Sequence, residues 1–379
     1  MAFISLRNIF DAIQWTYNGQ ANKVQLTGSI PQSYITPHFE FIPIENVDSV
    51  KSANQYGVFF TQDTKLYKST DYGETKTEVL DVGVGNIVFS MLVPGAVGIA
   101  FAQKTNGTGI MYRTADYGDT WSVIDTSATG ADIDPFYPPY YTGIANQATN
   151  WIFGEYRGGT FTADVRVFGA HVNDLAAWNV KITKASPGEV RHWHNVEYLY
   201  TPYERFVVTS GDLNAQLTWF QSPTSNGTGI WEQLTLTPTD QRVRVTKILM
   251  LGDKLIWGSD STGDVTGGVW EGVYDPVAKT ISSVNRLLYH NKTSLSIVKS
   301  GSLVLVSFFN EAVVDFAGYL YSSLDGGQTW CLESREPVDL SATIGGFSQI
   351  MGPDKAGYFY LQGKYLVSGV NVYRLSYKN

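Results

Sequence analysis

The sequence contains only one cysteine, Cys331, so no disulfide can form within the chain. Charged residues are also scarce, at 16% of the 379 residues, against the roughly 25% that is usual in soluble domains. The formal net charge is −8, and no cluster of lysine and arginine stands out. Because nucleic-acid recognition requires a basic surface, we predict no nucleic-acid partner. The fold must be held together by packing and hydrogen bonds alone.

Long apolar segments are lacking as well. No run approaches the roughly 20 apolar residues that a helix needs to span a bilayer, so we predict no membrane span. Residues 1–7 lack the charged segment, the apolar segment and the cleavage site of a secretory signal. We therefore expect no signal peptide and a cytoplasmic location, unless the chain belongs to a larger particle.

Aromatic residues and glycines are abundant by contrast. Aromatic residues make up 14% of the chain, and there are 37 glycines. Strands favour aromatic side chains and tight turns favour glycine, so this composition predicts an all-β, turn-rich protein. It is not typical of a helical bundle or of a disordered chain.

An eight-residue motif occurs three times, at residues 69–76, 114–121 and 323–330. Its pattern is Ser/Thr-x-Asp-x-Gly-x-Thr-Trp, with Lys76 replacing the tryptophan in the first copy. An Asp in a turn accepts hydrogen bonds from the following backbone N–H groups, and the Gly supplies a positive φ. We therefore predict three hairpin turns, with a degraded copy at residues 222–231. The predicted structural residues are Asp71, Gly73, Asp116, Gly118, Trp121, Asp325, Gly327 and Trp330.

These motifs resemble the Asp box, or BNR repeat, of the sialidase-like β-propellers. The resemblance implies a propeller in which the boxes are structural and lie on the face away from the ligand site. Similar propellers occur in bacteriophage virions, in tail or receptor-binding positions, which implies a virion location here. Sialidases of this fold also carry an early Arg-Ile-Pro segment. The nearest match is Ser29-Ile30-Pro31, without the arginine, so we expect no sialidase activity.

The organisation that we predict is one all-β propeller over residues 23–379, with a short helical extension over residues 1–22. Repetition at this spacing indicates seven blades, with six as the alternative. Residues 23–27 are expected to complete the last blade and close the ring. Apolar residues recur every three to four positions in the extension, which predicts an amphipathic helix. These residues are Phe3, Leu6, Phe10, Ile13 and Trp15. The helix either caps the propeller or docks onto other protein subunits of an assembly.

Polar side chains cluster where propeller geometry brings strand ends together. In a four-stranded blade, the start of the innermost strand and the end of the second strand meet on the face opposite the boxes. The candidate ligand-binding residues at these positions are His192, Trp193, His194, Tyr156, Arg157, Asp260 and Glu311. The candidate catalytic carboxylates are Glu155 and Asp212.

Three functions of this face remain open. Glu155 and Asp212 could hydrolyse a glycoside, a reaction that uses two carboxylates. The same groups could bind a sugar or a peptide, with the aromatic rings stacking on it. A third possibility is that these groups bind no ligand and serve only as hydrogen-bond partners for one another. We predict a non-catalytic structural or recognition module, with a glycoside hydrolase and a cytoplasmic assembly scaffold as alternatives.

The spacing of His192 and His194 also suggests metal binding, because alternate residues of a strand point to the same side. Two histidines and a nearby aspartate are too few to specify a metal centre from sequence. We therefore predict no metal and no other cofactor.

Overall fold

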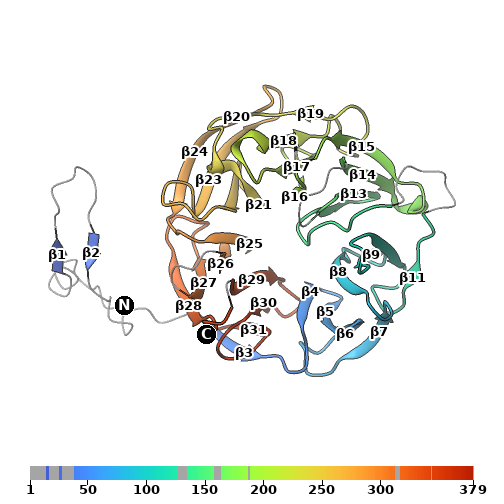
Figure 1. Cartoon of the computed structure of the whole chain (residues 1–379), viewed down its shortest axis with the longest axis horizontal. Coiled ribbons are helices and arrows are strands. Elements are labelled where there is room, and N and C mark those ends of the chain that lie inside the picture. The colour runs from blue at the N-terminus through green and yellow to red at the C-terminus, as the bar shows by residue number, and fades with distance from the viewer. Residues whose placement is uncertain are drawn as a thin grey trace. The chain divides into compact units, whose positions relative to one another are not determined.

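The computed structural model describes residues 14–16, 25–27, 38–126, 135–157, 164–186, 188–311, 316–342 and 344–378. The chain divides into two compact units, Met1–His38 and Phe39–Asn379. In the described part of the first unit, strands β1 (Gln14–Thr16) and β2 (Gln25–Thr27) pair antiparallel. The larger unit is a ring of antiparallel sheets arranged radially around a central axis (Figure 1). It is the predicted all-β propeller.

The first four sheets of the ring follow one another along the chain, and each has four strands. Their strands run outward from the axis in sequence order (Figure 1). The first sheet contains β4 (Ser49–Asn54), β5 (Gly57–Gln62), β6 (Lys65–Ser69) and β7 (Thr77–Asp81). The second contains β8 (Ile87–Leu92), β9 (Gly98–Gln103), β10 (Gly109–Thr114) and β11 (Ser122–Val123). The third contains β12 (Ile144–Gln147), β13 (Asn150–Gly154), β14 (Val165–His171) and β15 (Asn179–Lys184). The fourth contains β16 (Trp193–Leu199), β17 (Arg205–Ser210), β18 (Thr218–Gln221) and β19 (Glu232–Gln233).

The remaining strands form a five-stranded and an eight-stranded sheet. The fifth unit contains β20 (Thr235–Leu236), β21 (Val245–Leu251), β22 (Lys254–Ser259), β23 (Val269–Asp275) and β24 (Thr280–Leu288). One half of the larger sheet contains β25 (Thr293–Ser300), β26 (Leu303–Asn310), β27 (Ala317–Ser323) and β28 (Cys331–Pro337). The other half contains β29 (Gly345–Met351), β30 (Phe359–Lys364), β31 (Val372–Tyr377) and β3 (Phe39–Pro43). The halves join where β26 pairs with β29, so the described residues form seven radial units. Within the described ranges, short 3-10 helices lie at Val172–Asp174, Asn214–Gln216 and Gln241–Val243.

The second strand of each unit is buried on both of its faces, because neighbouring sheets cover it from either side. β5 reads Gly-Val-Phe-Phe-Thr-Gln and β9 reads Gly-Ile-Ala-Phe-Ala-Gln, and in both the first five residues are buried. Such continuous apolar runs are what a fully covered strand requires. The fourth strand β7 (Thr-Glu-Val-Leu-Asp) has no buried residue, as expected at the rim of the ring. The core therefore consists of separate apolar layers between adjacent sheets.

The ring is closed by β3, which pairs with β31 and completes the last four-stranded unit. This corrects the prediction that residues 23–27 close the ring, because β2 pairs with β1 instead. β3 fits this place because Phe39 is only 2% exposed and enters the apolar core of the last unit, with Phe41 packed against the same core. Closure removes the free edge that the first and last sheets would otherwise present.

The predicted N-terminal helix falls mostly on residues 1–13, which lie outside the described residues. Trp15, which we counted as part of the helical pattern, lies in strand β1. Among the described residues, no helix has the length and hydropathy that crossing a bilayer requires.

The three repeated motifs form hairpin turns of matching geometry between the third and fourth strands of their units. In the second copy, Asp116 Oδ1 accepts hydrogen bonds from the Thr120 backbone N–H at 2.9 Å and from the Thr114 hydroxyl at 2.7 Å. Its Oδ2 accepts the Thr120 hydroxyl at 2.6 Å. Asp71 and Asp325 make the same three bonds at 2.6–2.9 Å. All three copies therefore form the same turn, including the first, in which Lys76 replaces the tryptophan.

The degraded copy also forms a turn, with an altered hydrogen-bond pattern. Asn226 takes the place of the aspartate, and its side-chain oxygen accepts from the hydroxyls of Thr224 and Thr228, each at 2.7 Å. Trp231 donates its indole N–H to the Gly227 carbonyl at 3.2 Å, as Trp121 does to Gly118 at 3.1 Å in an intact copy. The tryptophan contact is thus retained where the aspartate is lost.

Candidate functional site

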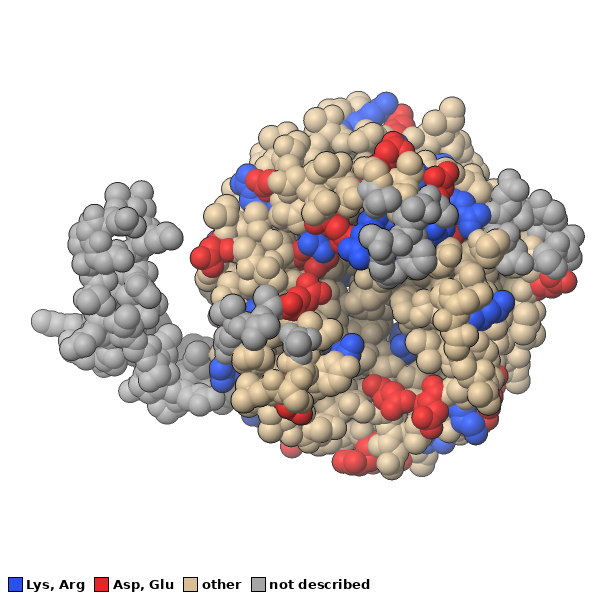
Figure 2. Space-filling model, viewed as in Figure 1, with Lys and Arg blue, Asp and Glu red and all other residues tan. Residues whose placement is uncertain are grey.

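A cavity of about 520 Å³ lies in the ring. The side chains that line it come from several units. They lie near the start of the first strand or near the end of the second strand of their unit. These strand ends lie on the face opposite the repeated turns. Figure 2 shows a hollow at the centre of the ring, with acidic and basic side chains at its edge. The cavity is therefore in the place where the sequence predicted a ligand site.

Most of the predicted site residues meet at this cavity. Tyr156, His192, His194, Asp212, Asp260 and Glu311 all line it. They come from four successive units of the ring, and the chain passes from the third unit to the sixth between Tyr156 and Glu311. Trp193, Glu155 and Arg157, in contrast, do not line the cavity, for reasons given below.

The two histidines lie at the start of the innermost strand β16, where alternate side chains point to the same side. His192 and His194 are 4% and 3% exposed, and both line the cavity. The same alternation turns Trp193 away, into the apolar layer between two sheets, where its ring lies edge-on to Phe220 at 6.1 Å. The prediction of Trp193 as a stacking surface for a ligand is therefore wrong.

Hydrogen bonds fix the orientation of both imidazole rings. The His192 Nδ1 atom lies 2.7 Å from the Arg157 carbonyl oxygen, which can only accept, so this nitrogen carries the proton and donates it. The Nε2 atoms of His192 and His194 face each other at 2.9 Å. Asp212 lies next to both, with a carboxylate oxygen 3.4 Å from Nε2 of His192 and another 3.5 Å from Nε2 of His194.

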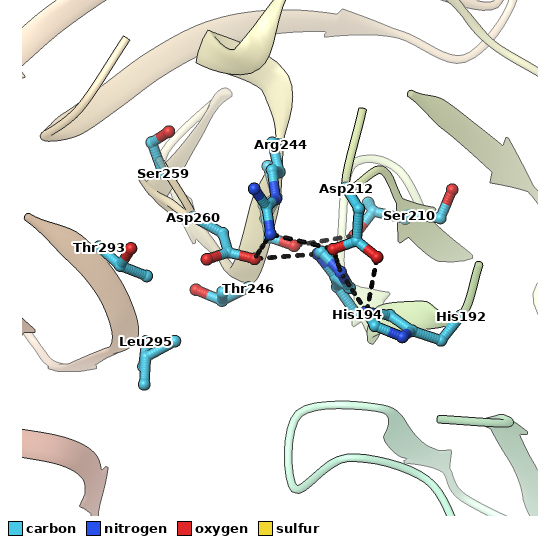
Figure 3. Close-up of polar contacts among 12 residues, drawn as sticks. His192, His194, Ser210, Asp212, Arg244, Thr246, Ser259, Asp260, Thr293 and Leu295 are labelled. Carbon is cyan, nitrogen blue, oxygen red and sulfur yellow. Dashed lines mark hydrogen bonds and ion pairs between the residues drawn. The ribbon is translucent and has the colours of Figure 1, made fainter. Parts of the chain in front are cut away.

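Arg244 joins two carboxylates across the cavity wall. Its Nη2 atom lies 2.9 Å from Asp212 Oδ1 and 2.8 Å from Asp260 Oδ2. Arg191 adds a second guanidinium contact to Asp212, at 3.3 Å. Figure 3 shows Arg244 between the two carboxylates, with both imidazole rings beside Asp212. Buried charges require such pairing, because an isolated ion in this environment is strongly disfavoured.

The surroundings move the pKa values of these groups apart. Burial alone would raise the pKa of Asp212, but the hydrogen bonds and charges of His192 and His194 hold it well below its usual range. Burial raises the pKa of Asp260, against the opposing charge of Arg244. Burial also lowers the pKa of His192. Asp212 is therefore ionised at neutral pH.

Glu155 is fully buried and has its hydrogen-bonding capacity filled away from the cavity. Arg166 donates to both of its oxygens, at 3.1 and 2.9 Å. The backbone N–H groups of Tyr137 and Arg166 add bonds of 3.0 and 2.8 Å. Arg157 is buried too, and its guanidinium lies over the Tyr137 ring and donates to the Asp164 carbonyl. The predictions of Glu155 as a catalytic carboxylate and of Arg157 as a ligand contact are therefore wrong.

Aromatic rings form another part of the cavity wall. Tyr140 and Tyr156 stack with ring centroids 4.8 Å apart, and Tyr156 lies 4.2 Å from the His192 ring. Burial raises the pKa of both tyrosine hydroxyls, so they stay protonated. The Tyr141 hydroxyl lies within hydrogen-bond distance of the carbonyls of Leu295 and Ser348. It thereby connects the third unit of the ring with the sixth and seventh.

Sequence reasoning missed several cavity residues. These are Lys51, Phe89, Tyr140, Tyr141, Arg191, Arg244, Gln362 and Lys364. Many of them lie at or near the start of a first strand, as His192 does, or at the end of a second strand. The rule that identified the histidines would have identified Arg244 and Tyr141 if it had been applied to every blade.

The comparisons with known proteins show the fold alone. The sequence matches no family model and no curated protein. A chain in the crystal structure of a mitotic checkpoint complex is similar in structure, with a TM-score of 0.53, 8% identity, and coverage of 95% of this chain and 99% of that one. YCF48 from Cyanidioschyzon merolae is similar with a TM-score of 0.54 and 12% identity, and the match covers 89% of this chain and 98% of YCF48. The WD40 β-propeller domain of Doa1 is similar with a TM-score of 0.51 and 11% identity, and the match covers 91% of this chain and 98% of that domain. The chain is thus a β-propeller.

Proposed function

We propose that this propeller is a non-catalytic recognition module that binds a glycan in the central cavity. The observation that carries the proposal is the composition of the cavity wall. Stacked tyrosines lie beside a network in which Arg244 bridges two carboxylates. Sugars present apolar faces that stack on aromatic rings, and hydroxyls that both donate and accept hydrogen bonds.

The volume of the cavity also suits a saccharide. At about 520 Å³ it falls within the range of roughly 300–1,000 Å³ that is common for small-molecule sites. Its polar groups have both signs of charge, since Lys51 and Lys364 line it together with Glu311. This mixture suits a polyhydroxylated ligand, whose hydroxyls can form hydrogen bonds with groups of either charge.

The arrangement of the carboxylates supports binding without turnover. Glu155, one of the two predicted catalytic carboxylates, is saturated by Arg166 and backbone N–H groups. Asp212 is held ionised, so it cannot serve as a general acid near neutral pH. Neither residue of the predicted pair is suited to protonate a leaving group.

One observation favours a second candidate, a glycoside hydrolase that uses Asp212 and Asp260. Burial raises the pKa of Asp260 while Asp212 stays ionised, which is the division of roles between acid and nucleophile. Both residues contact the same Arg244 nitrogen, so they are close enough for the roughly 5–5.5 Å separation of retaining enzymes. The same guanidinium, however, occupies the space in which a glycosidic bond would have to lie.

The role of the module in a larger assembly is a further part of this proposal. The three repeated turns resemble those of propellers in phage tails, where a glycan-binding module serves in receptor recognition. A cavity on one face leaves the opposite face, with its turns, available for protein contacts. A virion location is the expectation that follows from this assignment.

The test is a glycan panel scored for both retention and product release. Wild type is compared with Tyr156→Ala, which removes the stacking ring, and with Tyr200→Ala as a matched control. Tyr200 is 64% exposed and follows β16 at the end away from the cavity. We expect wild type and Tyr200→Ala to retain the same glycan without releasing product, and Tyr156→Ala to lose at least about tenfold in affinity.

The same panel separates the two candidates. Product release by wild type that disappears in both Asp212→Asn and Asp260→Asn would establish the hydrolase and overturn the proposal. Absence of any retained glycan would overturn both.

A further inference from the structure

We propose that His192, His194 and Asp212 bind a divalent transition-metal ion at the edge of the cavity. The proposal is independent of glycan binding, because it rests only on the geometry of these three side chains. Residue types and spacing alone did not specify a metal centre, whereas the folded chain brings the three ligand groups together.

The three side chains offer ligand atoms at the spacing of a single coordination sphere. The two Nε2 atoms are 2.9 Å apart, and carboxylate oxygens of Asp212 lie 3.4 and 3.5 Å from them. One ion at about 2.1 Å from each ligand, the usual metal–nitrogen distance, would require separations of this size. The candidate ligand atoms all lie within 4.8 Å of one another.

The proton positions on the two rings provide a second argument. His192 donates from Nδ1 to the Arg157 carbonyl, so its Nε2 presents a lone pair toward His194. Nδ1 of His194 faces Asp260 Oδ2 at 3.7 Å, and this oxygen already accepts from Arg244 at 2.8 Å. An N–H on Nδ1 of His194 is therefore favoured by the acceptor oxygen that it faces, which leaves a lone pair on its Nε2 too.

Two lone pairs that face each other at 2.9 Å repel unless a positive centre lies between them. A proton shared by the two Nε2 atoms could serve, and it would also leave the proton on Nδ1 of His194 in place. That nitrogen is buried and has no hydrogen-bond partner in the described structure. A metal ion accepts both Nε2 lone pairs and, unlike a proton, can also bind the Asp212 carboxylate, whose oxygens lie 3.4 and 3.5 Å from the two nitrogens.

The neighbouring groups match the surroundings of known metal ligands. Metal-bound histidines usually direct their other ring nitrogen to a carbonyl or a carboxylate, which fixes the ring and its tautomer. His192 does so with the Arg157 carbonyl and His194 does so, at longer range, with Asp260. Arg191 and Arg244 hold the Asp212 carboxylate in place beside the rings.

The ligand set indicates which ions the site would take. Two imidazoles and one carboxylate suit zinc, iron or manganese, whereas magnesium and calcium prefer oxygen ligands alone. Three protein ligands leave coordination positions open, as in catalytic rather than structural zinc sites. Because all three ligands line the cavity, those positions face the space that a bound molecule would occupy.

The experiment uses untagged full-length protein that has been treated with a chelator and then titrated with Zn²⁺ by calorimetry. We expect one Zn²⁺ per chain, and no comparable binding of Mg²⁺. His194→Asn and Asp212→Asn should each weaken Zn²⁺ binding by at least about 100-fold. His171→Gln is the matched control and should bind as wild type does, since His171 is exposed and does not line the cavity.

Two further measurements make the result decisive. Thermal unfolding shows whether each variant folds. Asp212→Asn is the milder of the two substitutions, because asparagine has nearly the same shape as aspartate and the Asp212 side chain is partly exposed. The absorption spectrum of the Co²⁺-loaded protein reports directly on histidine coordination. Absence of stoichiometric Zn²⁺ binding by wild type, or unchanged binding by both ligand variants, would overturn the proposal in favour of a proton shared between the rings.

Discussion

At the scale of single residues, strand alternation gives neighbouring positions opposite roles. His192 and His194 reach the cavity while Trp193 between them packs into the core, although all three are buried. The sequence indicated the right strand end, because the topology of a propeller blade brings that end to the axis. Strand alternation already implied that Trp193 faces away from the side shared by the two histidines, and the assignment of Trp193 as a ligand contact ignored it.

Glu155 shows a second limit of sequence reasoning at this scale. Its place at the end of β13 resembles that of Asp212 after β17, and Tyr156, the next residue, does line the cavity. Its role is decided by Arg166, eleven positions later on the adjacent strand, which binds both of its oxygens. Such a partner becomes evident only once the register of β13 and β14 is known.

Replacement of Trp193 by alanine should destabilise the propeller strongly. The side chain is fully buried in the layer between two sheets, so truncation leaves a large cavity there. We expect a loss of about 3–5 kcal/mol in the free energy of unfolding, measured by urea denaturation. Tyr200→Ala, at an exposed position, should change it by less than about 0.5 kcal/mol. A loss below about 1 kcal/mol for Trp193→Ala would contradict its assignment to the core.

Asp116 should make stability depend on pH in the acid range. The side-chain and backbone hydrogen bonds from Thr120 lower its pKa to about 2, from an ordinary value of 3.8. A carboxylate whose pKa is lowered on folding stabilises the fold above its unfolded pKa. This contribution is therefore complete above about pH 4 and is lost as the pH falls toward 2.

The measurement compares urea midpoints of wild type and Asp116→Asn at pH 6 and at pH 2.5. Asparagine keeps the shape of the side chain but does not ionise, so wild type should be the more stable at pH 6. That advantage should shrink at pH 2.5. A difference between the two proteins that does not change with pH would show that the charge of Asp116 has no part in holding the turn.

At the scale of elements, the repeated turns were predicted in full because their structure is local. The hydrogen bonds that the Asp116 carboxylate makes all join residues no more than four positions apart. Lys68 and the Ala96 carbonyl add longer-range bonds to the same turn. The motif requires glycine at this position for two separate reasons. Gly118 has a φ of +87°, and a Cβ atom there would lie 2.5 Å from the ring of Phe59 in the neighbouring unit. The first reason can be read from the motif, while the second depends on the packing of the ring.

These two contributions can be separated by mutation. Gly301→Ala places a side chain at a φ of +59° with no atom within 4 Å, so it reports the backbone cost alone. We expect a loss of about 1 kcal/mol for that variant. Gly118→Ala should lose at least about 2 kcal/mol more, because it also overpacks the contact with Phe59. Equal losses in urea denaturation would show that the close approach is relieved without cost.

The scale of the whole molecule is where the sequence was least informative. A closing strand was expected, but residues 23–27 were assigned to it, and the structure uses β3. The choice between two short apolar segments depends on which of them fits the outer edge of β31, some 330 positions away in the chain. Composition and periodicity carry no information about a contact at that separation.

Two truncations test the closure. A chain that starts at Phe39 keeps β3, whereas one that starts at Ile44 lacks it and exposes the edge of β31. We expect the shorter chain to melt at a lower temperature than the longer one and to self-associate in size-exclusion chromatography. If the two truncated proteins behaved alike, the pairing of β3 with β31 would not be what holds the ring shut.

The pairing of β3 with β31 also sets an order in time. β3 is the first strand of the ring to be synthesised and β31 is the last, with about 330 residues between them. At the usual rate of about 5–20 residues per second, β3 waits on the order of half a minute on the ribosome before its partner exists. The inner blades can pack on one another during that interval, but the last unit cannot. The ring can therefore close only after β31 has been synthesised.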